Sequence, residues 1–561
     1  MKIYVRILLI ALSAFLMFLS FPHADQGWLA WISMIPGFIA ICGTGTKKGF
    51  WLGWLFGSLF YGFITSWFGI FGWEPLVVGS LFFGLYFAIF FIVYGYYTEK
   101  SAPASQWQRF LIAPMLWAAV EWLKAQGIFG FPWGDLGITQ YKFQALLQTA
   151  SVFGVYGISF VVVFVNNLIA ETILAIAAFG NETGIKPWKE FPKPAFWSGA
   201  ANLFKMLTAE KGENITLRTA WIASALLIPA ILISGQLMVP MQVKVGDYES
   251  VCNGKVKVGI TQINMNQYEK WHPKNLNKSL KLLEEGTKEL VKNQAQVVIW
   301  PETAIPQTNP LNNYSLREFL TRIPVQNKVE LIAGIVDKNS GNFFNTVIHI
   351  NQEGEVVSKY NKIQLVPLGE YFPFPAFLKK YKIFDRIGNY THGTELKIFD
   401  TPYGKFQPLI CFESFFPYLA RKGVAQGTQI LVVQTNDSWF HRSNAAKIHY
   451  INGMFRAVEN RVWLVQCANS GVSGVIDPWG RSLMETELFV QTNISCDIYP
   501  YNSPRTLYNR WGNIFPVTAG LAAIILLLLP VLRSNRKGNN KPDSKLQTQD
   551  KTKEKDKAET K

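Results

Sequence analysis

Residues Phe406–Ser414 read FQPLICFES, an apolar run that ends at a cysteine and is followed two residues later by a glutamate. Short runs of this kind, rich in apolar residues, predict β-strands. A cysteine at the end of a strand is either a small buried hydrophobic residue or a nucleophile that reacts as its thiolate. For an isolated cysteine the first interpretation is favoured, so the rest of the chain has to decide the role of Cys411.

Cys411 lies in a stretch, from Lys255 to about Ile498, where short β-rich runs alternate with amphipathic helical segments. This alternation predicts an α/β domain. Several of the runs are apolar throughout, which indicates sheets covered on both faces. The candidate strands are VKVGITQI (256–263), AQVVIWPET (295–303), VELIAGIVD (329–337), NTVIHIN (345–351), FQPLICFES, TQILVVQTND (428–437) and RVWLVQCANS (461–470), and the candidate helices are 275–293 and 443–460.

Polar or reactive residues occur where several of these runs stop, namely at Gln262, Glu302, Cys411 and Asn436. In layered α/β folds, functional sites are commonly built at the ends of strands. The pattern therefore predicts a site at this position of the domain.

The two ends of the chain are apolar enough to enter a membrane. About 18 mostly apolar residues are needed to cross the hydrocarbon core, and windows near this length recur before Pro240 and once more near the C-terminus. They predict eight spans: Tyr4–Phe21, Trp28–Cys42, Phe50–Trp73, Leu76–Tyr97, Phe110–Lys124, Ala150–Ile176, Leu217–Val239 and Ile514–Leu532. The first has no clear cleavage site after it, so we expect it to be retained as a span and not removed as a signal peptide.

Basic residues collect at the N-terminus, in the loops that follow even-numbered spans, and in the tail after Arg533. Because cytoplasmic loops are enriched in Lys and Arg, the segment between the seventh and eighth spans is expected to face outward. This placement also explains the net charge of +16 without nucleic acid. The predicted organisation is a seven-span domain (1–240), an extracytoplasmic α/β domain (255–499), an eighth span (510–533) and a disordered basic cytoplasmic tail (534–561).

Two further residues could assist a cysteine nucleophile. Glu302, between Pro301 and Pro306, is either a helix cap or turn residue, or a partly desolvated general base. Lys362 is either a lysine at a strand edge or a fixed cation that favours the thiolate and stabilises an oxyanion. Each residue alone is unspecific.

Other chemistries find little support in the sequence. No GxSxG motif is present, and His272, His441 and His449 have no zinc-ligand spacing. The five cysteines are odd in number, scattered and without CxxC spacing, which argues against a full disulfide framework and leaves room for a free thiol.

The segments WPET (300–303), YNKIQLVPLGEYFPF (360–374) and ICFES (410–414) resemble, in order and spacing, the Glu-Lys-Cys triad of the nitrilase, or carbon-nitrogen hydrolase, superfamily. Within it, the chain is most similar to the membrane branch, the apolipoprotein N-acyltransferase family. SFPHADQGWLAWISMIPG (20–37), GFPWGDLG (130–137) and LVPLGEYFPF (365–374) match that branch, and the eight predicted spans agree with it. The resemblance covers nearly the whole chain except the tail.

The resemblance implies a nitrilase-like αββα sandwich inserted in an eight-helix transmembrane bundle. It assigns the general base to Glu302, the oxyanion-stabilising cation to Lys362 and the nucleophile to Cys411. It further implies supporting acidic roles for Glu370 and Glu413, and substrate-binding roles for Trp271, Phe412 and Tyr371. For Trp271, simple packing against a loop stays an equally good interpretation.

The activity implied is transfer of an acyl chain from the sn-1 position of a membrane phospholipid, through a Cys411 thioester, to the N-terminal α-amine of S-diacylglyceryl-cysteine in apolipoproteins. The alternative is a membrane-anchored carbon-nitrogen hydrolase, an amidase or nitrilase that releases its intermediate to water. The resemblance implies a monomer in the bacterial cytoplasmic (inner) membrane, with its catalytic domain facing the periplasm or exterior. No metal or organic cofactor is expected, because the lysine supplies the electrostatic stabilisation.

Some segments stay open to interpretation. Glu370–Phe384 is rich in aromatic residues and lysines, as an interfacial lid is, although it could be a structured connecting loop. The chain also departs from the family pattern at three positions: Gln466 replaces a common arginine, His441 a usual glycine and Phe412 a frequent tyrosine. These departures bear on substrate preference or loop geometry, since no triad member is lost.

Overall fold

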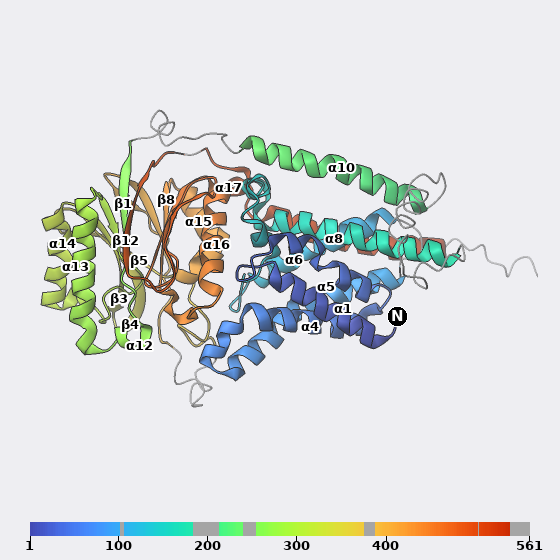
Figure 1. Ribbon diagram of the computed structural model, residues 1–561, viewed down its shortest axis with the longest axis horizontal. Helices are drawn as coiled ribbons and strands as arrows, with labels where there is room; N and C mark the ends of the chain where they lie inside the picture. Colours follow the sequence, from blue (N-terminus) through green and yellow to red (C-terminus); the bar gives the residue numbers. More distant parts are fainter. Residues whose placement is uncertain (101–105, 183–212, 239–253, 375–387, 503, 539–561) are drawn as a thin grey trace, which may run out of the picture.

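The computed structural model describes residues 1–100, 106–182, 213–238, 254–374, 388–502 and 504–538. Figure 1 shows a layered α/β domain on one side and long helices on the other. The tail from 539 and most of the candidate lid (375–384) lie outside the described residues.

The α/β domain contains two six-stranded sheets. The first has the strand order β12-β1-β2-β3-β4-β5 and the second β11-β10-β9-β8-β7-β6. In the second sheet, β7, β8 and β9 are parallel, so their carboxyl ends lie at the same edge. The strands are β1 (Val256–Gln262), β2 (Val297–Ile299), β3 (Glu330–Asn339), β4 (Asn342–Ile350), β5 (Val356–Asn361), β6 (Phe399–Thr401), β7 (Gly404–Ile410), β8 (Ile430–Thr435), β9 (Trp463–Ala468), β10 (Gly474–Ile476), β11 (Ser482–Glu485) and β12 (Thr492–Ile498).

Helices cover the outer faces of both sheets. Helices α13 (Leu276–Lys292) and α14 (Tyr314–Asn327) pack on the first sheet, and α15 (Pro417–Val424) and α16 (Ala445–Asn460) on the second. Side chains from both sheets, such as Val258 and Val432, form a separate core between them. This arrangement confirms the predicted αββα sandwich, and it explains why strands such as β8 are buried on both faces.

The opposite side of the molecule consists of apolar helices. Every window predicted to span the membrane contains helix. Among the residues that the structure describes, three helices are long and apolar enough by length and composition to cross one: Trp73–Glu99, Ala150–Ala177 and Trp221–Met238. The count of eight spans therefore stays a prediction. The helices are α1 (Ile3–Leu19), α2 (Ala30–Ser33), α3 (Ile35–Ile41), α4 (Gly45–Ile64), α5 (Trp73–Lys100), α6 (Gln106–Lys124), α7 (Gln144–Leu147), α8 (Ala150–Glu182), α10 (Glu213–Met238), α17 (Leu507–Trp511) and α18 (Ile514–Gly538).

Two predicted spans differ from single helices. Trp28–Cys42 is divided among a short 3-10 helix (Gly27–Leu29), α2 and α3, and Pro36 stands at the start of α3. A proline fits the first turn of a helix but not its interior, which is consistent with a new helix beginning there. The window Phe50–Trp73 leaves the α-helix at Ile64 and continues as a 3-10 helix, Ser66–Phe71.

The helix layer formed by α15 and α16 is continuous with the apolar helices. Buried residues of this layer and of the long helices belong to one hydrophobic core. Trp133 stacks on Phe415 with ring centroids 4.6 Å apart, and Trp67 meets Phe440 edge-on at 4.7 Å. A polar contact adds to this packing, because Glu459 of α16 accepts a hydrogen bond from the Val155 amide of α8 at 3.3 Å.

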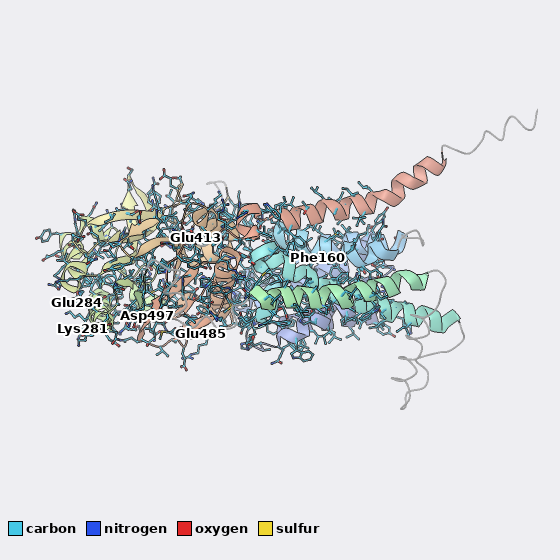
Figure 2. All side chains as sticks on the ribbon, turned by 90° about the horizontal axis from the view of Figure 1, so that it is seen from above. Phe160, Lys281, Glu284, Glu413, Glu485 and Asp497 are labelled. Carbon is cyan, nitrogen blue, oxygen red and sulfur yellow. The ribbon has the colours of Figure 1, made fainter. Side chains whose placement is uncertain are left out.

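Figure 2 shows where Glu413, the acidic residue of the FQPLICFES segment, lies in the molecule. Glu413 lies in the part of the α/β domain nearest the long helices, whereas Lys281 and Glu284 lie at the far end. The predicted site is therefore on the side of the sandwich nearest the long helices.

Gly334 in β3 makes room for the turn that carries Glu302. A Cβ atom at Gly334 would lie 2.5 Å from the Pro301 carbonyl oxygen and 2.8 Å from the Glu302 Cα. The turn is further fixed by the Ala304 amide, which donates to the Gly334 carbonyl at 2.8 Å. Both clashing atoms belong to the backbone, so a side chain here would displace the turn.

We predict that Gly334→Ala lowers the free energy of unfolding by about 2 kcal/mol through overpacking. Thermal unfolding of the detergent-solubilised protein measures the change. Gly453→Ala in α16 is the matched control, because its Cβ would meet nothing closer than the Leu464 methyl groups at 3.4 Å. Equal unfolding temperatures for the two variants would contradict the prediction.

Candidate active site

The three residues predicted as a triad each follow a strand. Glu302 comes after β2, Lys362 directly after β5 and Cys411 directly after β7. Lys362 Nζ lies 3.8 Å from Glu302 Oε1, and both charged groups act electrostatically on the Cys411 thiol. The two sheets thus bring together residues that are more than one hundred positions apart in the chain.

The Lys362 ammonium group is buried, with a side chain only 1% exposed. It is paired with Glu370, whose Oε1 and Oε2 lie 2.9 and 2.8 Å from Nζ. Burial by itself lowers the pKa of Lys362, but Glu370 and Glu302 more than offset this effect and raise it. Lys362 is therefore a permanent cation at the centre of the site.

Glu302 is oriented by a neighbour that the sequence analysis did not single out. Asn345 in β4 donates to Glu302 Oε1 at 2.6 Å and to Glu370 Oε1 at 3.1 Å, so one amide aligns both carboxylates. Burial raises the pKa of Glu302, while Lys362 opposes the shift. A carboxylate with a raised pKa is a better proton acceptor than an exposed one.

A second neighbour, Lys270, lies on the other side of the Glu302 turn. Its side chain is fully buried at the end of α12 (Gln267–Lys270), and Nζ donates to the Glu302 carbonyl at 3.1 Å and to Thr303 Oγ1 at 3.0 Å. Burial lowers the pKa of Lys270 to about 8, and Glu302 acts in the opposite direction. These bonds hold Thr303 in its left-handed conformation, with φ of 46°.

The Cys411 turn is also left-handed, with φ of 50°. This conformation is uncommon for residues other than glycine and often marks functional positions. Burial raises the pKa of the Cys411 thiol well above its usual range, Glu302 raises it further and Lys362 lowers it. The thiol therefore carries its proton at neutral pH until a base removes it.

Glu413 is a structural partner of this turn. Its Oε2 accepts from the Ile410 amide at 2.7 Å, and its Oε1 accepts from Tyr360 Oη and the Ile363 amide at 2.7 Å and from the Gln364 amide at 3.0 Å. Burial raises the pKa of Glu413, and these bonds act in the opposite direction. The carboxylate joins the strand end before the thiol to the segment that follows Lys362.

Comparison with known proteins places this geometry in a family. Residues 257–498 match the family described as carbon-nitrogen hydrolase, and residues 13–168 match the apolipoprotein N-acyltransferase N-terminal domain. The chain is similar to apolipoprotein N-acyltransferases over nearly its whole length. It is 29% identical over 534 residues to the apolipoprotein N-acyltransferase of Geobacter metallireducens, covering 93% of this chain and 94% of that protein.

Other matches include the apolipoprotein N-acyltransferase of Gloeobacter violaceus, at 27% identity over 531 residues, covering 91% of each chain. The α/β domain is also similar to the crystal structure of Saccharomyces cerevisiae Nit3, a nitrilase superfamily member. That match has 21% identity and a TM-score of 0.36, and it covers 47% of this chain and 95% of Nit3.

The three substrate-binding candidates have different surroundings. Phe412 is buried and its ring lies 6.0 Å from Phe131 of the helical side. Tyr371 meets His392 edge-on at 4.6 Å. Trp271 is 38% exposed and directly follows the buried Lys270. Phe412 is thus the one of the three whose ring contacts a residue of the helical side.

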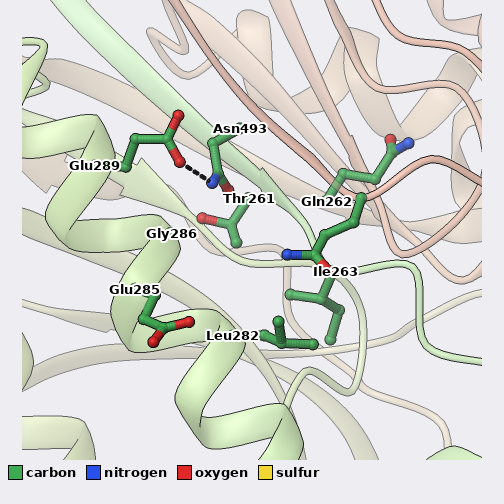
Figure 3. A pocket seen from close by; sticks show the side chains of 9 residues that line it. Thr261, Gln262, Ile263, Leu282, Glu285, Gly286, Glu289 and Asn493 are labelled. Carbon is green, nitrogen blue, oxygen red and sulfur yellow. Dashed lines mark hydrogen bonds between the residues drawn. The ribbon is translucent and has the colours of Figure 1, made fainter.

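Two other strand-end residues have roles outside the triad. Gln262 donates to the Glu487 and Val490 carbonyls at 3.1 and 2.8 Å, and it lines a small polar hollow beside α13 that contains no triad member (Figure 3). Asn436 donates to Gln267, at the start of α12. The side-chain amide of Gln262 therefore binds the β11–β12 loop, because β1 ends against α13 and that loop.

Two departures from the family pattern have visible local effects. His441 has φ of 47°, a conformation in which glycine has no steric cost, so the histidine stores strain in this loop. Gln466 donates to the Val472 carbonyl at 3.0 Å and is fully buried in β9. This hydrogen bond stabilises the turn between β9 and β10.

One cluster resembles a metal site in composition. The Cys411 sulfur and one atom each of Asp437 and His449 lie within 4.8 Å of one another. Both ring nitrogens of His449 are already engaged, with Asp437 Oδ1 and the Cys411 carbonyl, each at 2.9 Å. The three groups are therefore joined by hydrogen bonds, and a metal ion could bind His449 only if one of these two hydrogen bonds were broken.

We predict that Lys362→Met lowers the free energy of unfolding by about 3 kcal/mol, because it leaves a buried carboxylate without its cation. Loss of Lys362 raises the pKa of Glu302 further, so the variant recovers stability as pH falls and Glu302 is protonated, and loses it as pH rises through that pKa. Chemical denaturation across pH measures both effects.

The control for this variant is Lys359→Met. Lys359 pairs with Asp337 at 3.0 Å, but its side chain is 43% exposed. Exposed pairs contribute about 0 to 1 kcal/mol, so this variant should change little at any pH. A pH-independent loss for Lys362→Met, equal to that of the control, would refute the argument.

Proposed function

We propose that the protein transfers a fatty acyl chain from the sn-1 position of a membrane phospholipid to the N-terminal α-amine of S-diacylglyceryl-cysteine in apolipoproteins. The similarity to apolipoprotein N-acyltransferases over nearly the whole chain supports this activity. The observation that carries the proposal is the position of the Cys411 turn. Phe412 and Phe415, which follow Cys411, belong to the hydrophobic core that α15 and α16 share with the apolar helices.

In the first step, Glu302 accepts the proton of the Cys411 thiol while the sulfur attacks the ester carbonyl. Since burial keeps the thiol protonated at rest, proton removal has to accompany the attack. Lys362 lies beside Glu302 and stabilises the negative charge of the tetrahedral intermediate. The carbon–oxygen bond of the ester then breaks, the proton passes from Glu302 to the departing lysophospholipid, and a thioester remains on Cys411.

In the second step, the α-amine of the diacylated cysteine attacks the thioester carbonyl. Glu302 accepts a proton from the amine, the carbon–sulfur bond breaks, and the thiolate regains a proton. The product is an amide-linked, triacylated lipoprotein. Both substrates are lipid-anchored, which gives a physical reason for joining a hydrolase-like domain to membrane helices.

The proposal includes the finer features of the sequence prediction. The catalytic residues are Glu302, Lys362 and Cys411, and Glu370 and Glu413 support them. The substrate-binding residues are Trp271, Phe412 and Tyr371. The protein acts as a monomer in the bacterial inner membrane through eight spans. The distribution of Lys and Arg among the loops supports an outward-facing catalytic domain.

We predict that wild-type protein mixed with phospholipid carries a fatty-acyl adduct on Cys411, and that Cys411→Ala carries none. Intact-mass and peptide-mass analysis measure the adduct, and Cys467→Ala is the control because Cys467 is fully buried between the sheets. Absence of an adduct in the wild type under all conditions would remove the first step. Adding a diacylated lipopeptide should discharge the adduct into a triacylated product, whereas release as free fatty acid alone would favour a hydrolase.

A further inference from the structure

His449 occupies an unusual position behind the Cys411 turn. It lies in α16 with a fully buried side chain, and each ring nitrogen has one partner. Nδ1 is 2.9 Å from Asp437 Oδ1, and Nε2 is 2.9 Å from the Cys411 carbonyl oxygen. Asp437 is also buried, and Thr435 donates to the same Oδ1 at 2.7 Å.

The chemistry of these partners fixes the protons on the ring. A backbone carbonyl can only accept, so Nε2 must carry a hydrogen. An ionised carboxylate also only accepts, so Nδ1 must carry the second hydrogen. The alternative, a protonated Asp437 beside a neutral ring, places the proton on the stronger acid, since carboxylic acids are more acidic than imidazolium by about 2.5 pKa units in model peptides.

We propose that His449 is an imidazolium, ion-paired with Asp437, that positions the Cys411 turn and places a fixed positive charge beside the thiol. The proposal rests on the proposed function at one point, the role of the Cys411 thiol as the acyl carrier. His449 is a positioning residue, since it touches the backbone of the nucleophile and not the reacting atoms.

The positioning role follows from the strain of the turn. Cys411 has φ of 50°, which a residue with a side chain adopts only when its surroundings enforce it. The bond from His449 to the Cys411 carbonyl holds this conformation from one side, and Glu413, through the Ile410 amide, holds it from the other.

The His449–Asp437 pair is also connected to the helical side of the molecule. The His449 ring stacks on Phe415 at 5.3 Å, and Phe415 stacks on Trp133. Asp437 begins the short helix that ends at Phe440, which packs against Trp67. Both members of the ion pair are thus anchored, through one aromatic contact each, to the helical side.

The other charged groups around the Cys411 thiol determine how much an imidazolium would favour its thiolate form. Glu302 and Asp437 disfavour the thiolate, and Lys362 favours it. On the helix of His449 itself, Arg456 is paired with Glu459 at 2.8 Å, and Lys447 is paired with Glu485. Lys362 is the cation that acts on the thiol against Glu302 and Asp437, and the imidazolium adds a second positive charge beside it.

The test is the rate at which iodoacetamide alkylates Cys411, measured by peptide mass from about pH 7 to about pH 10, where thiols titrate. His449→Gln keeps an amide that can donate to the Cys411 carbonyl but removes the charge. We expect its alkylation rate to fall about tenfold, which is one pKa unit, at every pH below the apparent pKa of the thiol.

Asp437→Asn is the second variant, and it separates charge from folding. It removes the carboxylate that retains the second proton and leaves a side-chain amide whose N–H can donate to the bare Nδ1 of a neutral ring. We expect the ring to become neutral in this variant, so that one positive and one negative charge beside the thiol are lost together and the alkylation rate falls less than in His449→Gln. A rate above that of the wild type would mean that only the negative charge was lost, and it would overturn the imidazolium.

The control is His349→Gln, which breaks another buried His–carboxylate pair in the same domain. His349 Nε2 lies 2.6 Å from Glu330 Oε2, between β4 and β3. This variant should lower the unfolding temperature and leave the alkylation profile unchanged.

An unchanged alkylation rate in His449→Gln, or an equal fall in His349→Gln, would overturn the proposal and leave His449 a packing residue. Alkylation does not require acyl transfer. A shifted profile in a protein that forms no acyl adduct would therefore refute the proposed function while keeping this inference.

Discussion

The buried ammonium of Lys362 is the constraint on which the rest of the site depends. Moving a cation out of water costs several kcal/mol, and the cost is offset only by partners with good geometry. Glu370 and Glu302 supply the opposite charge, and Asn345 aligns both carboxylates with one amide. These residues come from four different segments, so the site exists only when the ends of β2, β4 and β5 meet the loop that carries Glu370.

The nucleophile belongs to the other sheet, and Glu413 joins it to this charged cluster. Four hydrogen bonds connect Glu413 to the end of β7, to Tyr360 in β5 and to the two residues after Lys362. The second sheet is in turn covered by α15 and α16, which share a hydrophobic core with the long helices. A sandwich with two independent outer layers could be detached from a membrane, but in this protein one layer is common to both parts.

The electrostatics of the site also bear on the order of chemical events. Burial raises the pKa values of both Cys411 and Glu302, so the resting site favours a protonated thiol close to a strong proton acceptor. A pre-formed thiolate would react with any electrophile that entered, whereas a thiol activated during the attack requires a well-placed ester. In the proposed reaction, this arrangement favours a carbonyl delivered from the lipid side over random encounter with water.

The sequence by itself determined the elements with strong local signals. Apolar runs bounded by turn residues predicted the strands of the sandwich, and the motifs around Glu302, Lys362 and Cys411 indicated the residues that the fold brings together. Local pattern was less reliable at helix boundaries: Trp28–Cys42 is divided into three helical segments, since a new helix begins at Pro36.

Only the tertiary structure decided which side chains serve the triad. Asn345, Lys270 and the His449–Asp437 pair have no distinctive spacing in the chain, because their partners lie on other strands and helices. Gln262 stood at a strand end like Glu302, yet its side-chain amide donates to the β11–β12 loop. The physical reason is that hydrogen bonds and ion pairs act over a few ångströms in space, while a sequence pattern reports only on neighbours along the chain.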